Sequence, residues 1–502
     1  MRENTLRSAS LVLVGATALS NVLGVIRDHF LASNIPTDRL DVYYAAFRLP
    51  DFVFYILIAG AISAAVIPVL SQVVKKDETE AKKLVSNVFT IGICALIIAL
   101  GLLYLLMPNL MPLLAKDFNP EKLNEAVRLA RIMLLSPLFF GISYYYTSVL
   151  NTHRRFTAPA LAPVVYNLSI IIATMLWSGR IGVMAPVLGV IFGAFLHWVI
   201  QIPAVNNLGY WPKPMINFRD PNLKRIFKLM VPRSLAMGAG QLQVLAFTSF
   251  ASALPGAIAI YSLADNIQTV PLAIIGNSLA TALFPNLAHF GKSDRKNYSE
   301  LLVKGIRTII FFAVPAAAML IIVRAQVIRL ILGYGYFDWN DTRMALEALG
   351  YFALGIVAQC LVPILARAFY AVENTSYPMM STLITTAVGI IAGWYGMQWW
   401  GLNGLAIAFT LSSWTNAIIL WCGIKYKVGV NLNGGLPMLI MKVMIMTLLT
   451  AVMMELVKIA IGNIINIDRV VNLFIQTVVT TGVGAAGYLG LAWLWRIPEI
   501  RK

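Results

Sequence analysis

The stretch from residue 374 to residue 424 contains no Asp, Glu, Lys or Arg side chain. One membrane-spanning helix needs about 20 predominantly apolar residues, so this stretch alone is long enough for two spans. Of the 502 residues in the chain, 59% are hydrophobic and only 12% are charged, whereas a soluble domain has about 25% charged residues. The sequence therefore predicts an all-α polytopic membrane protein.

The apolar stretches divide into about 14 transmembrane helices, and none shows the alternating pattern of a membrane β-barrel strand. The start of the chain is basic and then apolar, as in a signal peptide. Its helix continues through Arg27 and further spans follow, so we interpret it as a retained first helix. The expected helix centres are Ala18, Ile58, Ala95, Phe139, Ile171, Gly193, Leu242, Ile275, Phe312, Ala358, Gly389, Phe409, Thr447 and Ala485.

The formal net charge of +17 has a topological explanation. An even number of spans places both termini on one side, and most loop Lys and Arg residues fall on that side, including Lys76, Arg155, Arg225 and Lys296. Cytoplasmic loops carry such an excess, so we expect both termini in the cytoplasm. The partners expected for this basic surface are membrane lipids and not nucleic acid.

Motifs of common enzymes are absent from the sequence. Its three cysteines are far apart in apolar segments, its four histidines form no HExxH, and it has no Walker A loop and no GxSxG elbow. We expect no enzymatic activity, no cofactor and no metal site.

The chain repeats itself weakly after a shift of 217 residues. The matched residues are Tyr44 with Tyr261, Arg48 with Asp265, Ala65 with Ala282, Pro68 with Pro285, and Leu70 with Leu287. A shift of six helices preserves orientation, which predicts two parallel six-helix lobes with a central cleft between them. We expect an N-lobe over residues 1–208, a C-lobe over 209–430, and two extra helices over 431–502.

Charged and amide side chains interrupt the helices that would line this cleft. Ionisable groups in a membrane are costly unless they pair or face water, so they indicate a binding site. The candidates are Asn21, Arg27, Asp28, Asp41, Arg48 and Asp51 in helices 1 and 2, and Arg233, Asp265 and Asn266 in helices 7 and 8. Structural interpretations stay open: Arg27–Asp28 and Arg48–Asp51 as ion pairs, Asp265 as a brace, and Arg233 as a residue reaching the interface.

In these motifs the chain resembles the MurJ (MviN) family of lipid II flippases, within the multidrug/oligosaccharidyl-lipid/polysaccharide exporter superfamily. The resemblance covers the whole chain. The motifs are Val22–Asp28, Asp41–Pro50, Asn151-Thr152 with Arg155-Phe156 and Pro159-Ala160, Ala162-Pro163 with Asn167, Ile216-Asn217-Phe218, Ala264-Asp265, Gly333-Tyr334-Gly335 with Phe337, and Phe369-Tyr370.

The resemblance implies the transport of lipid II, an undecaprenyl pyrophosphate carrying a disaccharide-pentapeptide, by alternating access. The lipid would move from the inner to the outer leaflet of the bacterial cytoplasmic membrane for peptidoglycan synthesis. Its headgroup would occupy the cleft, and its tail would follow a groove formed with the last two helices. Arginine suits the pyrophosphate because it can contact two phosphate oxygens at once. A monovalent cation or the membrane potential would drive the cycle.

The chain departs from the family pattern at four positions. Typical members carry Arg in place of Asn21, Phe54 and Asn266, and Glu in place of Ala59. These departures keep three alternatives open: a flippase for lipid-linked oligosaccharides of O-antigen or capsule, a cation-coupled drug exporter, and a scaffold without transport activity.

Overall fold

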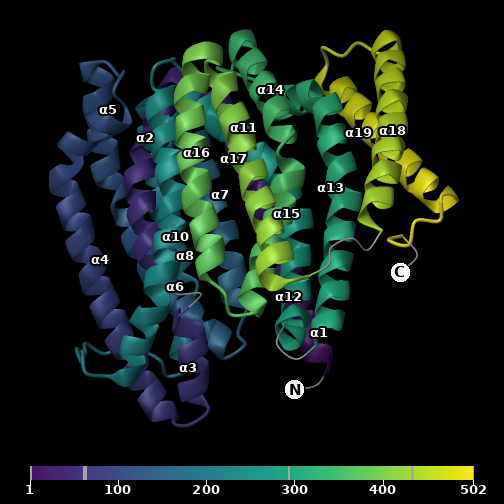
Figure 1. The fold of residues 1–502 in the computed structure, drawn as a ribbon. Helices are drawn as coiled ribbons and strands as arrows, with labels where there is room; N and C mark the ends of the chain where they lie inside the picture. The colour runs from purple at the N-terminus through teal and green to yellow at the C-terminus, as the bar shows by residue number, and fades with distance from the viewer. Residues whose placement is uncertain (1–2, 60–64, 292–293, 431–434, 501–502) are drawn as a thin grey trace. The chain divides into compact units, whose positions relative to one another are not determined.

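A computed structural model describes residues 3–59, 65–291, 294–430 and 435–500, and the chain in these ranges folds into helices (Figure 1). Ten of the described helical segments are long and apolar enough to cross a membrane, or eleven if the bent pair Trp339–Ala353 and Ile356–Ala371 forms one span. The all-α polytopic fold is confirmed. The count of 14 spans stays a prediction.

Two compact units divide the chain, Met1–Ala259 and Ile260–Lys502. The first contains α1 (Glu3–Asn34), α2 (Thr37–Phe54), the π-helix η1 (Tyr55–Ala59), α3 (Ile67–Val74), α4 (Glu78–Leu114), α5 (Pro120–Met133), α6 (Leu135–Thr152), α7 (Thr157–Ile181), α8 (Met184–Val199), α9 (Ile202–Asn206) and α10 (Pro221–Ala251). The unit thus continues past residue 208 and includes the linker after α9 and the whole of α10. The predicted lobe boundary at residues 208 and 209 stays a prediction.

The division between the units falls within α11 (Ala257–Pro271). The second unit continues with η3 (Leu272–Asn277), α12 (Ser278–Phe290), α13 (Arg295–Ile331), α14 (Trp339–Ala353), α15 (Ile356–Ala371), α16 (Ser376–Trp400), α17 (Leu402–Gly423), η4 (Ile424–Val428), α18 (Leu436–Ile464) and α19 (Val470–Leu494). Within this unit α18 and α19 lie beside α13 (Figure 1).

The internal repeat found in the sequence is also present in the backbone. Helices α4 and α13 are both 37 residues long, and each begins after an N-cap aspartate, Asp77 or Asp294. The π-helices η1 and η3 follow α2 and α11 at the same 217-residue offset. Helices α7 and α16 each span 25 residues and each end at a glycine with φ of 55°, Gly182 or Gly401. The helices of these pairs therefore share their lengths or their caps.

Small residues allow the helices within a unit to approach closely. A Cβ atom added at Gly189 of α8 would lie 2.8 Å from Cα of Ile170 in α7, and one at Gly193 would lie 2.9 Å from the carbonyl oxygen of Tyr166. Small residues at such positions allow backbones in a membrane to pack together. Gly189 and Gly193 therefore let α8 pack directly against the backbone of α7.

Candidate functional site

Arg27 lies in α1 at the centre of a hydrogen-bonded cluster. Its Nε and Nη2 atoms donate to Oδ1 of Asp28 at 3.0 and 2.8 Å, and Nη1 donates to Oδ1 of Asn167 in α7 at 3.1 Å. The Asn167 amide in turn donates to the backbone oxygen of Ser20 at 3.2 Å and to its hydroxyl at 3.3 Å. Ser20 and Arg27 are seven residues apart, about two helical turns, so one side chain of α7 contacts both.

Arg27 and Arg48 lie in one electrostatic neighbourhood on α1 and α2. Tyr44 of α2 interacts electrostatically with Arg27, Asp28 and Arg48, and Tyr166 of α7 interacts with Arg27 and Asp51. The Tyr44 hydroxyl is buried without a hydrogen-bond partner among the described residues. Two arginines, two carboxylates and these phenols thus form the arginine cluster of unit 1.

Arg48 has a partner outside the first two helices. Its Nε donates to the Thr248 hydroxyl of α10 at 2.9 Å, and that hydroxyl donates to the backbone oxygen of Val244 at 2.8 Å. Asp51 follows three residues later on α2, is half-buried, and interacts electrostatically with Arg48. The guanidinium of Arg48 is therefore oriented by α10 as well as by its own helix.

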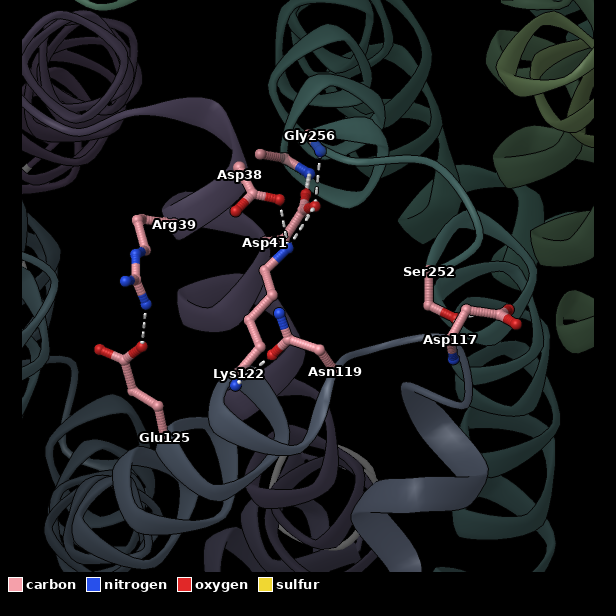
Figure 2. A network of polar contacts seen from close by, with 10 residues as sticks. Asp38, Arg39, Asp41, Asp117, Asn119, Lys122, Glu125, Ser252 and Gly256 are labelled. Atoms are coloured by element: carbon pink, nitrogen blue, oxygen red, sulfur yellow. Dashed lines mark hydrogen bonds and ion pairs between the residues drawn. The ribbon is translucent and has the colours of Figure 1, made fainter.

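Asp41 lies apart from this cluster, at the end of unit 1 where α2 begins (Figure 2). Its carboxylate is fully buried and accepts hydrogen bonds from the backbone N–H groups of Gly256 at 2.7 Å and Ala259 at 2.9 Å. The Lys122 ammonium lies 3.6 Å from Asp41 and also pairs with Asp38. Asp41 thus stabilises the N-terminus of α11, where unpaired N–H groups favour an anion.

The local sequence explains why Lys122 has these partners. Asn119 caps α5 by accepting a hydrogen bond from the Lys122 backbone N–H at 2.8 Å, and Pro120 occupies the first helical position. A cation in the first turn of a helix is opposed by the helix dipole. Its pairing with two aspartates of α2 compensates for this unfavourable position.

The same end of unit 1 also contacts the end of α10. Asp117, between α4 and α5, accepts a hydrogen bond from the Ser252 hydroxyl at 3.3 Å, and Arg39 pairs with Glu125 of α5 at 2.7 Å (Figure 2). Together with the Asp41 contacts, these pairs fasten α2, α5 and the α10–α11 turn to one another.

The candidates in the second unit have different surroundings. Asp265 is half-buried in α11 and accepts a hydrogen bond from Nε2 of Gln268 at 2.8 Å, and Oε1 of Gln268 accepts one from Gln359 of α15 at 2.9 Å. Asn266 is half-buried, and its backbone oxygen accepts a bond from the Thr269 hydroxyl. Asp265 is thus linked through Gln268 to α15.

Asn21 and Arg233 are exposed on α1 and α10, and neither has a side-chain partner among the described residues. The structure therefore brings Arg27, Asp28, Arg48 and Asp51 together, and it separates Asp41 from them. The described residues contain no group of three or more His, Cys, Asp or Glu that could hold a metal ion.

Three contact residues received no role from the sequence alone. Asn167 lay within a recognised motif, but nothing in the sequence paired it with Arg27. Thr248 gave no signal, because a threonine in an apolar helix is common. Lys122 gave only a weak signal, since the helix dipole disfavours a lysine in the first turn after an Asn-Pro cap and a nearby anion compensates for this.

A duplicated bundle of apolar helices with paired arginines and aspartates in its first two helices defines a multi-pass membrane protein of the transporter class. Comparisons with known proteins agree. The sequence model described as the lipid II flippase MurJ matches residues 37–477, which is most of the chain. The chain belongs to the MurJ family of lipid II flippases.

Individual relatives are distant but cover nearly the full chain. A probable lipid II flippase MurJ of Rickettsia prowazekii is 26% identical over 459 residues, which cover 90% of each chain. The lipid II flippase MurJ of Burkholderia cenocepacia is 28% identical over 432 residues, which cover 84% of each chain.

Solved structures share the fold. A lipid II flippase MurJ in an inward closed conformation superposes with a TM-score of 0.81 at 23% identity, over 98% of this chain and 100% of that one. An inward-facing multidrug resistance transporter of the MATE family and MOP superfamily superposes with a TM-score of 0.70 at 14% identity, over 83% of this chain and 98% of that one. At these identities the likeness concerns the fold.

Proposed function

We propose that this chain translocates lipid II from the inner to the outer leaflet of the bacterial cytoplasmic membrane by alternating access, with both termini in the cytoplasm. The proposal is supported by the family match and by one structural observation, the hydrogen bonding of the Arg27 guanidinium. Its guanidinium has five N–H donors, and three of them are engaged by Asp28 and Asn167. The other two have no partner among the described residues, and the side chain is 22% exposed.

A guanidinium in this state suits a phosphate ligand. Asp28 and Asn167 fix its plane, so little side-chain entropy is lost when an anion binds. The two remaining N–H groups can contact phosphate oxygens, and charge-assisted bonds of this kind are about twice as strong as neutral ones. We propose that Arg27 binds the pyrophosphate, that Arg48 supports it, and that Asp28 and Asp51 limit the excess positive charge.

The remaining candidates take secondary roles in this proposal. Asn21 and Arg233 are exposed, and we propose that they contact the headgroup as it enters and leaves. Asp265 and Asn266 would line the cleft from the C-lobe, and Asp41 would act through α11 without touching the ligand. The prenyl tail would follow the apolar surfaces of α18 and α19, and a monovalent cation or the membrane potential would supply the driving force.

Complementation tests the proposal. The chain is expressed in bacteria depleted of their own lipid II flippase, and lipid II reaching the outer leaflet is measured. The Arg27→Ala protein should insert normally and fail to transport, because a lost charge-assisted contact is worth roughly 1.5–3 kcal/mol, or about one to two powers of ten in binding. Arg27→Lys should restore part of the activity, since lysine cannot contact two oxygens in a fixed geometry.

Arg154→Ala provides the matched control, because Arg154 is exposed in the turn between α6 and α7. It removes the same charge outside the arginine cluster and should be mild. If Arg27→Ala transports lipid II as well as the parent does, the cluster is not the pyrophosphate site. If the parent chain itself fails to complement while lipid-linked oligosaccharides or drugs are moved, the substrate assignment is wrong.

A further inference from the structure

The linker between α9 and α10 contains an extended segment, residues 211–219, which we name the strap. It runs along α4 and uses polar side chains of that helix as hydrogen-bonding partners. The backbone N–H groups of Lys213 and Met215 donate to the hydroxyls of Ser86 and Thr90, both at 3.2 Å. The strap is therefore held against α4 at successive alternate residues, much as an edge strand is held by a neighbouring strand.

The strongest attachment is made by Asn87 of α4, which is fully buried. Its Oδ1 accepts a hydrogen bond from the backbone N–H of Asn217 at 2.8 Å, and its Nδ2 donates to the backbone oxygen of the same residue at 2.9 Å. One side-chain amide thus satisfies both polar backbone groups of Asn217. The backbone of Asn217, the middle residue of the Ile216-Asn217-Phe218 motif, is therefore held against α4. The side chains of Ile216 and Phe218 on either side of it are exposed.

The residue before the strap provides a second attachment. Tyr210 is buried, its ring lies 4.8 Å from that of His153, and the Lys82 ammonium lies 5.4 Å from the ring centre. Gly209 turns the chain here with a φ of +68°, close to the end of the Lys82 side chain. The linker is thus fastened to α4 and to the α6–α7 turn before the strap begins.

The outward side of the strap is apolar and aromatic. Trp211 is 53% exposed, Ile216 61% and Phe218 64%. Exposed cations accompany these side chains: Lys213 and Arg219 in the strap, and Lys224, Arg225 and Lys228 in the first two turns of α10. The one carboxylate among them, Asp220, is occupied as the N-cap of α10.

Aromatic and aliphatic side chains next to several cations are typical of segments that lie in the headgroup region of a membrane. The strap contacts the first third of α4 and ends two residues before α10 begins. We propose that the strap is a lipid-binding element, with Trp211, Ile216 and Phe218 inserted among the lipids and Lys213 and Arg219 bound to anionic phospholipid headgroups. The proposal does not depend on which substrate the protein transports.

Photocrosslinking tests the insertion. Benzoylphenylalanine is placed at Ile216 or Phe218 of the full-length protein, which is reconstituted in bilayers of phosphatidylethanolamine and phosphatidylglycerol. Illumination should produce covalent protein–lipid adducts, which are detected by mass spectrometry. The same probe at Tyr210 is the buried control and should crosslink to protein. Crosslinking at 216 and 218 to protein alone would overturn the proposal.

Lipid retention tests the headgroup preference. The double variant K213Q/R219Q is compared with K116Q/R128Q, which removes two exposed cations at the opposite end of α4 and in α5. In vesicles that mix phosphatidylglycerol with phosphatidylcholine, K213Q/R219Q should lose anionic lipid by about fivefold for each cation removed, and added salt should reduce the difference. Equal losses in the two double variants, or no loss in either, would show that the strap has no preference for anionic headgroups.

Discussion

The carboxylate of Asp41 accepts a hydrogen bond from the backbone of Gly256, 215 residues further along the chain. This contact joins the start of α2 to the start of α11, so a side chain in the first repeat caps a helix of the second. Such a bond depends on the charge of the aspartate and on its complete burial. Its energetic contribution can therefore be measured by removing the charge while keeping the shape.

Asp41→Asn should destabilise the protein by about 1.5–3 kcal/mol, the usual range for hydrogen bonds to a charged group. Asparagine keeps one acceptor oxygen, but it loses the second acceptor and the ion pair with Lys122. The measurement is the midpoint of thermal unfolding in detergent. Asp38→Asn is the control, because that side chain is 50% exposed and should change stability by less than about 1 kcal/mol. Equal midpoints for the two variants would contradict this account of Asp41.

Asn167→Ala should lower lipid II transport by about tenfold while leaving expression unchanged. The amide orients Arg27 towards the ligand, and without it the guanidinium loses a hydrogen bond worth roughly 1–1.5 kcal/mol. Transport is measured in cells that depend on each variant. The neighbouring Leu168 is exposed, so Leu168→Ala should transport normally. Full activity of Asn167→Ala would mean that Arg27 needs no orientation by α7.

Stability should depend on pH through His153. Burial lowers the pKa of His153 below its usual 6.5, and nearby Lys82 and Arg155 act in the same direction against Glu78. The folded protein therefore takes up this proton less readily than the unfolded chain, and stability should fall as the pH drops below 6.5 towards the lowered pKa. The unfolding midpoint at pH 5.5 should lie below that at pH 7.5.

The variant His153→Gln should reduce this difference between the two pH values, since glutamine does not titrate. His289→Gln, at an exposed position in α12, serves as the control and should retain the difference. If the parent and His153→Gln respond to pH alike, another group is responsible for the dependence.

Asn87→Ala should release the strap from α4. Two hydrogen bonds to the backbone of Asn217 are lost, and local opening should become about ten times more frequent, which corresponds to roughly 1.4 kcal/mol. Trypsin cleavage after Arg219 reports this opening. Asn207→Ala lies in the same linker at an exposed residue and should leave the cleavage rate unchanged.

Gly189→Ala should destabilise unit 1 by about 2–3 kcal/mol or prevent insertion, because its Cβ atom would meet the backbone of α7 at Ile170. Gly179→Ala provides the contrast, since nothing lies within 4 Å of a Cβ atom there. Alanine at that position should be neutral or stabilising by up to about 1 kcal/mol. Thermal unfolding of the two variants distinguishes a steric effect from a general intolerance of alanine.

The sequence predicted the features that depend on local pattern. Apolar length indicated the membrane-spanning class, and the 217-residue shift indicated the repeat that the paired π-helices and Asp caps confirm. The number of spans was harder, because α2 and α10 carry charged and amide side chains and are not among the ten described segments that are apolar enough. Charged side chains lower their hydropathy, and these are the side chains that a transporter needs.

The partners of the candidate residues could not be predicted, because they come from distant segments. Arg27 meets Asn167 after 140 residues, and Arg48 meets Thr248 after 200. Asp41 was grouped with the binding residues because it lies on the same helix as Arg48. Its burial against the start of α11 depends on tertiary packing, which no spacing within α2 reveals.

The turns after α6 and α15 share a rare backbone geometry, with Arg154 at φ 58° and Glu373 at φ 60°, although the two side chains carry opposite charges. The segments that follow, 157–182 and 376–401, leave through glycines with nearly the same torsion angles, 55° and −132° against 55° and −136°. The two repeats thus have the same backbone torsion angles at these turns and different side chains. A chimera that exchanges the two segments at these turns would preserve the path of the chain and transplant only the side chains, which makes the joints natural cutting points for engineering the protein.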